Sequence, residues 1–152
     1  MKPCLACLSW LAALLVTGCD TVNHSQIQVL PPKGAEKTRV IVPAAERQAV
    51  KQVLTDIATR LHFEDRSALS LIPETICSYA QLDVKHPMRV VAWVRKDCIC
   101  IDLFQTPPEA GETEAYCNLR DQILSELRKQ FGDRLTMVHK MNQVTGGPSA
   151  MP

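Results

Sequence analysis

Cysteine is the residue type with the clearest capacity for chemistry in this chain, which holds seven of them among 152 residues. Cys98 and Cys100 are separated by one residue, so on a strand both side chains point to the same face of the sheet. A bond between these two would strain the strand, and each therefore needs a partner elsewhere. Cys77 and Cys117 remain, and in an oxidising compartment this even set favours two disulfides. We expect Cys77–Cys98 and Cys100–Cys117, with the crossed pairing as the other arrangement.

The spacing of Cys98 and Cys100 also permits a functional alternative, because two thiolates can share one soft metal ion or cycle between thiol and disulfide. A zinc site usually combines cysteines two to four residues apart with a matching pair elsewhere, and no such spacing recurs after residue 19. We therefore expect no metal and no cofactor. Thiol redox or metal chemistry at this pair remains the alternative to disulfides, and free buried thiols are a third interpretation.

Sequence motifs of common enzymes are missing from the chain. It contains no G-x-S-x-G, H-E-x-x-H, P-loop or G-x-G-x-x-G pattern. We expect its four histidines to be surface residues, and Asp102 to form an ion pair on the sheet with Arg89 or Arg95. These observations favour a protein without catalytic residues.

The first residues predict an export signal rather than a membrane span. Leu5 to Val16 is an uncharged run of twelve residues, which as a helix reaches about 18 Å, well short of the ~30 Å hydrocarbon core. The run ends in Val16-Thr17-Gly18-Cys19, which resembles the lipobox of bacterial lipoproteins. The resemblance implies removal of residues 1–18, a diacylglyceryl thioether on the Cys19 sulfur and acylation, such as palmitoylation, of the new amino group.

This resemblance also implies a location in the cell envelope. Two or more acyl chains would hold the domain on the lipid bilayer, facing the periplasm. Asp20 directly after the lipidated position resembles the inner-membrane retention signal of enterobacterial lipoproteins, while the outer membrane remains the alternative. Loss of Lys2 with the signal balances the charges of the remaining chain, and only 5% of residues are aromatic. Both facts disfavour a nucleic-acid partner.

The remaining sequence predicts one domain with polar flanks. We expect a flexible linker at residues 19–37, in which Ile27 to Leu30 could form a short edge strand, a globular domain at 38–141 and a disordered tail at 142–152. Within the domain, Arg39 to Val42 predicts a strand, and the apolar stripe from Ala45 to Leu61 predicts an amphipathic helix.

The middle of the domain predicts strands. Thr75 to Asp83 is expected to turn Ile76, Ala80 and Leu82 toward the core. Arg89–Arg95 and Cys98–Phe104 are expected to pair as a hairpin through Lys96-Asp97, with one wholly apolar face and Trp93 beside Cys100 on the other.

The end of the domain predicts a second helix and a last strand. The helix begins after Thr113 and ends before Gly132, and the strand covers Arg134 to Lys140. The expected order is β-α-β-β-β-α-β. It gives an α+β two-layer sandwich with a mostly antiparallel sheet of four to five strands and both helices on one face.

These features together favour a membrane-tethered envelope module that binds another envelope protein. The candidate contact residues are Val91, Trp93 and Tyr79, which we expect on the sheet face away from the helices. A thiol-redox or metal-binding protein that uses Cys98 and Cys100 is one alternative, and a small-ligand binder is another.

Overall fold

The computed structural model describes residues 23–34, 42–107 and 111–140. The expected signal peptide, the lipobox with Cys19, residues 39–41 of the first expected strand and the expected tail lie outside these ranges.

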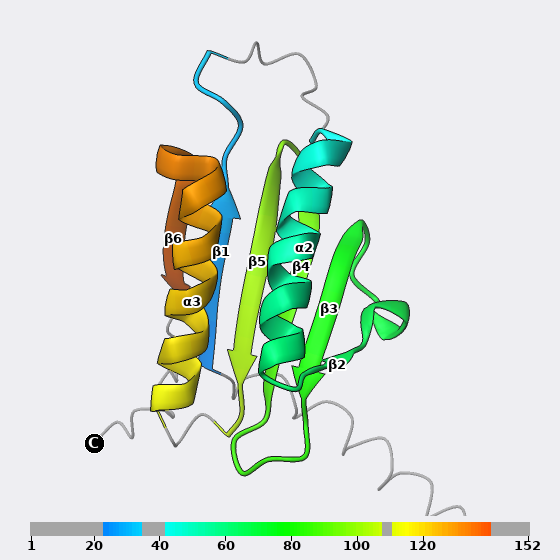
Figure 1. Cartoon of the computed structure of the whole chain (residues 1–152), viewed down its shortest axis with the longest axis vertical. Helices are drawn as coiled ribbons and strands as arrows, with labels where there is room; N and C mark the ends of the chain where they lie inside the picture. Colours follow the sequence, from blue (N-terminus) through cyan, green and yellow to red (C-terminus); the bar gives the residue numbers. More distant parts are fainter. Residues whose placement is uncertain (1–22, 35–41, 108–110, 141–152) are drawn as a thin grey trace, which may run out of the picture.

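One antiparallel sheet of six strands and two long helices make up the described chain (Figure 1). In chain order the elements are β1 (Asn23–Val29), α2 (Ala44–Arg60), β2 (Glu64–Asp65), the 3₁₀ turn η1 (Ser67–Leu69), β3 (Thr75–Gln81), β4 (Met88–Arg95), β5 (Cys98–Gln105), α3 (Glu114–Phe131), the 3₁₀ turn η3 (Gly132–Arg134) and β6 (Leu135–Lys140). The strands are ordered β2-β3-β4-β5-β1-β6 across the sheet. The expected α+β class with an antiparallel sheet is confirmed, but the sheet has six strands rather than four or five.

Both helices lie over the same face of the sheet (Figure 1). The apolar side of each helix packs on the apolar side of the strands, and this layer is the core of the domain. Its largest fully buried side chains are aliphatic except for Tyr116 and Gln105. No helix in the described ranges has the length and apolar character needed to cross a membrane.

The prediction of a flexible linker is wrong for residues 23–29, because they form β1 inside the sheet. This strand pairs antiparallel with β5 on one side and with β6 on the other. Ile27 and Val29 are fully or almost fully buried against the helices, so β1 is an inner strand that belongs to the core rather than an edge strand. Its end is held by Arg134, whose Nε donates to the Leu30 carbonyl at 2.6 Å and whose guanidinium forms a two-bond ion pair with Glu46 of α2.

The hairpin of β4 and β5 has the register that its sequence alternation predicts. Arg95 pairs with Cys98 and Trp93 pairs with Cys100. The apolar set from this hairpin faces the helices. Because side chains alternate along a strand, Trp93, Cys100 and Asp102 all lie on the other face of the sheet. Neither helix of the described ranges covers this face, and we call it the helix-free face.

The orientation expected for β3 is right for Ile76, which packs against the core, and wrong for Ala80 and Leu82. A register irregularity between Thr75 and Cys77 shifts the strand, and Cys77 and Tyr79 turn toward the helices. Ala80 lies on the opposite side, and Leu82 is past the end of the strand with 57% of its surface exposed.

Candidate functional site

Asp102 of β5 is the most heavily bonded acidic side chain on the helix-free face. His24 Nε2 and Gln26 Nε2 of β1 each lie 2.8 Å from its Oδ1, and Trp93 Nε1 of β4 donates to its Oδ2 at 2.5 Å. The carboxylate side chain is only 7% exposed. Three neighbouring strands therefore place their polar side chains around one buried acid.

These contacts decide the charge of Asp102. Burial by itself raises the pKa of the carboxyl group, because it removes water from the charged form. The hydrogen bonds from His24, Trp93 and Gln26 outweigh this effect, and the pKa of Asp102 is lowered below its usual value. The group is thus a fixed carboxylate at neutral pH that orients its three donors. The expected ion pair of Asp102 with Arg89 or Arg95 is not formed, because β1 supplies the partners instead.

The side chains of His24 and Trp93, which both bond to Asp102, are held in fixed positions. The rings of His24 and Phe104 are stacked with centroids 4.7 Å apart and planes 7° from parallel. Trp93 is half-buried and its indole N–H is already bonded to Asp102, so its ring cannot turn freely. Gln28 extends the network by donating to Gln26 Oε1 at 2.6 Å.

Positive charge borders the aromatic side chains. Arg89 and Arg95 both belong to β4 and, by alternation, share the helix-free face with Trp93. Arg89 is half-buried, with Nε donating to Ser78 Oγ at 3.3 Å, and Arg95 is exposed at the tip of the hairpin. Since Asp102 is enclosed by its donors, the accessible charge contributed by β4 and β5 on this face is positive. We call the set Trp93, His24, Phe104, Arg89 and Arg95 the aromatic-arginine face.

Of the three expected contact residues, Trp93 and Val91 lie on the expected face, but only Trp93 has exposed surface. Val91 lies on the helix-free face but is fully buried, so it offers no surface to a partner. Tyr79 is on the helix-covered face, where its hydroxyl lies 2.7 Å from Thr55 Oγ1 of α2. Burial raises the pKa of the Tyr79 hydroxyl. The shifted register of β3 is the physical reason for this second difference.

The four described cysteines carry free thiols, so the expected pairs Cys77–Cys98 and Cys100–Cys117 are not found. Cys77 lies in the core beneath the helices, whereas Cys98 and Cys100 lie on the other face of the sheet, which keeps the expected partners apart. Cys117 is half-exposed on α3, and its thiol donates toward Glu112 at 3.7 Å. Burial raises the pKa of both Cys77 and Cys100 to about 12. Cys98 and Cys100 instead lie against each other, with 3.9 Å between their sulfurs.

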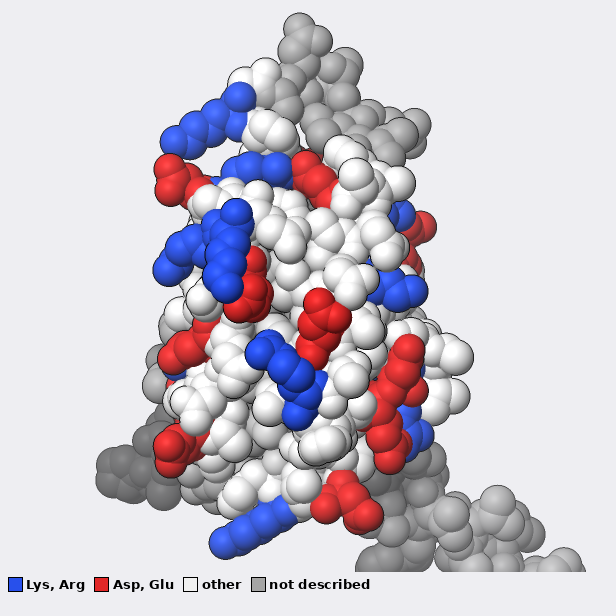
Figure 2. Space-filling view, in the orientation of Figure 1, with Lys and Arg blue, Asp and Glu red and all other residues white. Residues whose placement is uncertain are grey.

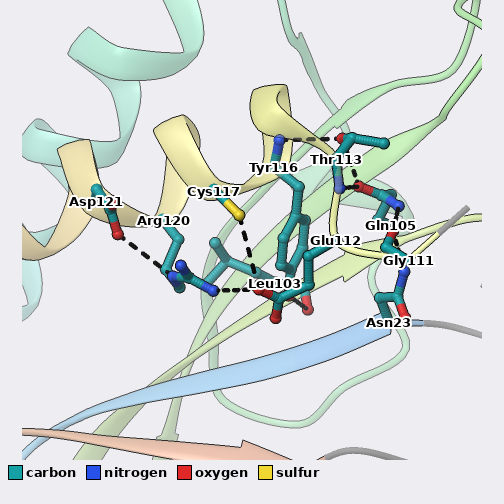
Figure 3. A network of polar contacts seen from close by, with 10 residues as sticks. All are labelled: Asn23, Leu103, Gln105, Gly111, Glu112, Thr113, Tyr116, Cys117, Arg120 and Asp121. Atoms are coloured by element: carbon teal, nitrogen blue, oxygen red, sulfur yellow. Dashed lines mark hydrogen bonds and ion pairs between the residues drawn. The ribbon is translucent and has the colours of Figure 1, made fainter.

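A second polar network ties the β5–α3 loop to the sheet (Figure 3). Gln105 is fully buried; its Oε1 accepts from the backbone N and the hydroxyl of Thr113, and its Nε2 donates to the Gly111 carbonyl at 2.6 Å. Asn23 donates to the same carbonyl, and Thr113 caps α3 by accepting from the Tyr116 N–H. This arrangement is structural, because every polar group of Gln105 is occupied within the loop and the cap.

The described part of the core contains a small void between the helices and the sheet. The void lined by Leu54, Phe63, Tyr79 and their neighbours is about 10 Å³, which is the size of a single water. Within the described ranges no group of three or more His, Cys, Asp or Glu side chains is placed to hold a metal ion. No hydroxyl or thiol of the described residues is hydrogen-bonded to His24, so the His24–Asp102 pair has no adjacent nucleophile to activate.

The sequence pattern missed two of the three residues that hold Asp102. His24 and Gln26 lie in the segment where the sequence predicts a linker. They alternate with Ser25 and Ile27, which is the pattern of a strand with one face toward the core. This alternation was the available signal. No protein-family model matches the chain, and no curated protein matches it either.

Proposed function

We propose that the chain is a lipid-anchored protein of a bacterial cell envelope, whose α+β domain is a non-catalytic binding module for an acidic partner protein. The lipobox Val16-Thr17-Gly18-Cys19 motivates the anchor, and Asp20 favours the inner membrane. The aromatic-arginine face is the docking surface. One observation carries this second part: a buried carboxylate holds His24 and Trp93 rigidly beside two arginines.

Rigid aromatic side chains favour binding because little conformational entropy is lost when a partner covers them. Trp and Arg are also the residue types that contribute most to the centres of protein interfaces. Arg89 and Arg95 belong to the aromatic-arginine face and favour a partner that presents carboxylates, while the Asp102 carboxylate is buried beneath its three donors.

The helix side of the domain is a weaker candidate for docking. Figure 2 shows that its positive and negative side chains are interspersed, with no extended area of one sign. Several of these charges are paired with each other, such as Arg134 with Glu46 and Lys129 with Glu126. A mixed surface of this kind keeps a domain in solution but gives little selectivity for a charged partner.

An anchor at Cys19 would bring one end of the sheet close to the bilayer, and the position of β1 supports this orientation. Only three residues separate Cys19 from Asn23, so the four Cα–Cα steps between them span at most about 14 Å. Asn23 pairs with Gln105, which also pairs with Met88, so the connection 82–87 lies at the same end of the sheet. Leu82 and Val84 are 57% and 41% exposed there, beside Lys85. Such residues suit the membrane interface, and the aromatic-arginine face then stands sideways to the membrane.

Two measurements test the anchor and the docking surface separately. For the anchor, Cys19→Ser should move the protein from the membrane to the soluble fraction and remove the acyl mass from the mature chain. An unchanged fractionation and an unchanged mass would contradict lipidation.

For the docking surface, Trp93→Ala and the charge reversal Arg95→Glu should each lower the yield of one cross-linked partner about tenfold or more in intact cells. Lys51→Glu, an exposed change on α2, is the matched control and should leave the yield unchanged. Equal yields from all variants would contradict docking on this face, and so would a partner that turns out to be a second copy of this chain.

A further inference from the structure

Cys98 and Cys100 form a pair of thiols on the helix-free face that the docking surface does not use. Their sulfurs are 3.9 Å apart, with one thiol directed toward the other. Cys100 is fully buried, while Cys98 is half-buried and also directs its thiol at the Arg95 carbonyl, 3.2 Å away. The pair therefore has one inner and one outer sulfur.

The outer sulfur is reachable from solvent. Cys98 lines an open hollow of about 520 Å³ beside the tip of the β4–β5 hairpin. The other lining residues are Gln28, Leu30, Pro31, Arg95, Lys96 and Asp97. An ion can therefore meet Cys98 first, with Cys100 behind it.

The number of available protein ligands limits which metal ions this pair of thiols can bind. Within the described ranges no third His, Cys, Asp or Glu joins the two sulfurs to form a larger cluster. Zinc in structural sites takes four protein ligands, so this pair does not suit it. Two soft thiolates without further ligands suit a soft monovalent cation such as Cu(I).

We propose that Cys98 and Cys100 bind one soft monovalent cation of the Cu(I) class as a two-thiolate site. On binding, two S–H bonds break, two metal–sulfur bonds form and two protons leave to solvent, with no change in oxidation state. The complex carries one negative charge, and Arg95, opposite Cys98 in the hairpin, supplies a compensating positive charge.

The sulfur separation fits this site without movement of the backbone. With metal–thiolate bonds of about 2.3 Å, a distance of 3.9 Å gives a sulfur–metal–sulfur angle of roughly 115°. Rotation of the outer side chain alone can widen the angle toward linear. A disulfide needs a sulfur–sulfur distance of about 2.0 Å. The two sulfurs of this pair would have to approach each other by about 1.9 Å in total to reach it.

The test is an anaerobic titration of the reduced mature protein, which lacks residues 1–18 with Cys4 and Cys7 and carries lipid on Cys19, purified in detergent, with Cu(I) in the presence of a coloured Cu(I) chelator. The native protein should withhold one equivalent of Cu(I) from the chelator, and X-ray absorption should report two sulfur ligands. Cys98→Ser and Cys100→Ser should each weaken binding about tenfold or more. Cys98→Ser is the decisive variant, because the residue is half-exposed and its replacement leaves the core untouched.

Cys117→Ser is the matched control, because Cys117 is equally half-exposed but lies on α3 away from the pair. It should bind Cu(I) like the native protein. Failure of the native chain to withhold Cu(I), or equal binding by Cys98→Ser, would overturn the proposal. It would also be overturned if protein taken from cells and alkylated at once contained a Cys98–Cys100 disulfide in place of two thiols.

Discussion

Trp93 Nε1 and Asp102 Oδ2 are joined by a 2.5 Å hydrogen bond across the β4–β5 hairpin. Through this bond the buried carboxylate of Asp102 fixes the orientation of the Trp93 ring on the helix-free face. It links stability to the proposed function, because the same carboxylate also orients His24 and Gln26 of β1.

Acid should weaken the domain through Asp102. The pKa of the Asp102 carboxyl group is lower in the folded state than in the unfolded chain, where it is near 4. The ionised group therefore stabilises the fold fully above about pH 4. This contribution is lost as the pH falls through the pKa of the folded state. We expect the free energy of unfolding of the native protein to fall below about pH 4. Asp102→Asn should cost roughly 1–3 kcal/mol at pH 7 and flatten this acid slope.

Urea unfolding from pH 7 to pH 2 measures this effect. Asp65→Asn is a control on the edge strand β2, where the pKa of Asp65 is lowered by hydrogen bonds from Ser67 but the side chain is exposed. It should change the free energy of unfolding at pH 7 much less than Asp102→Asn does. Equal losses in the two variants would contradict a special role for the buried acid.

Replacement of Gln105 by leucine should destabilise the domain, even though the two side chains have similar volumes. The variant leaves the Thr113 N–H and hydroxyl without their acceptor, and it leaves the Gly111 carbonyl with Asn23 as its remaining donor. Unpaired buried polar groups cost about 1–3 kcal/mol. Chemical unfolding should show this loss, and hydrogen exchange should rise first in the opening turn of α3. A Gln105→Leu protein as stable as the native one would contradict the role of the network in Figure 3.

The four thiols should differ strongly in reactivity. Cys77 and Cys100 have pKa values raised to about 12 by burial, about three above the usual thiol, so their thiolate fraction at pH 8 is roughly a thousandfold smaller. Cys98 and Cys117 are half-exposed. Timed alkylation followed by peptide mass spectrometry should label Cys98 and Cys117 first. Early labelling of Cys77 in folded protein would contradict its place in the core.

The proposed anchor at Cys19 predicts that the 82–87 connection contacts lipid. In vesicles with brominated acyl chains, Leu82→Trp in the lipidated protein should show stronger fluorescence quenching than Leu71→Trp. Leu71 is 97% exposed but precedes β3 at the opposite end of the sheet, so it is a matched control. Equal quenching at the two positions would contradict this orientation. The lipid anchor itself is tested separately, by the acyl mass of the mature chain.

Local patterns predicted the parts of the fold that depend on local physics. The helix at 44–60 follows from its apolar stripe, and the β4–β5 register follows from alternation on both sides of Lys96-Asp97. The Thr113 cap and the Gly132 end of α3 follow from side-chain and backbone preferences.

The position of β1 could not be predicted in the same way. This strand pairs with residues of β5 and β6 that come seventy or more positions later in the chain, so no local signal fixes its neighbours. The site around Asp102 was missed for the same reason, because two of its three donors belong to β1. In β3 the expected face is right for Ile76 but reversed after it by an irregularity in register, which sequence alternation does not reveal.

Site-specific photo-cross-linking in intact cells tests the central claim most directly. A photoreactive amino acid is placed at Arg95, beside Trp93 on the aromatic-arginine face, and in a second strain at Lys51 on the exposed side of α2. We predict one discrete adduct with an acidic envelope protein from position 95, lost in a Trp93→Ala background, and none from position 51. Equal adducts from both positions, or an adduct from position 95 that persists without Trp93, would contradict docking on this face.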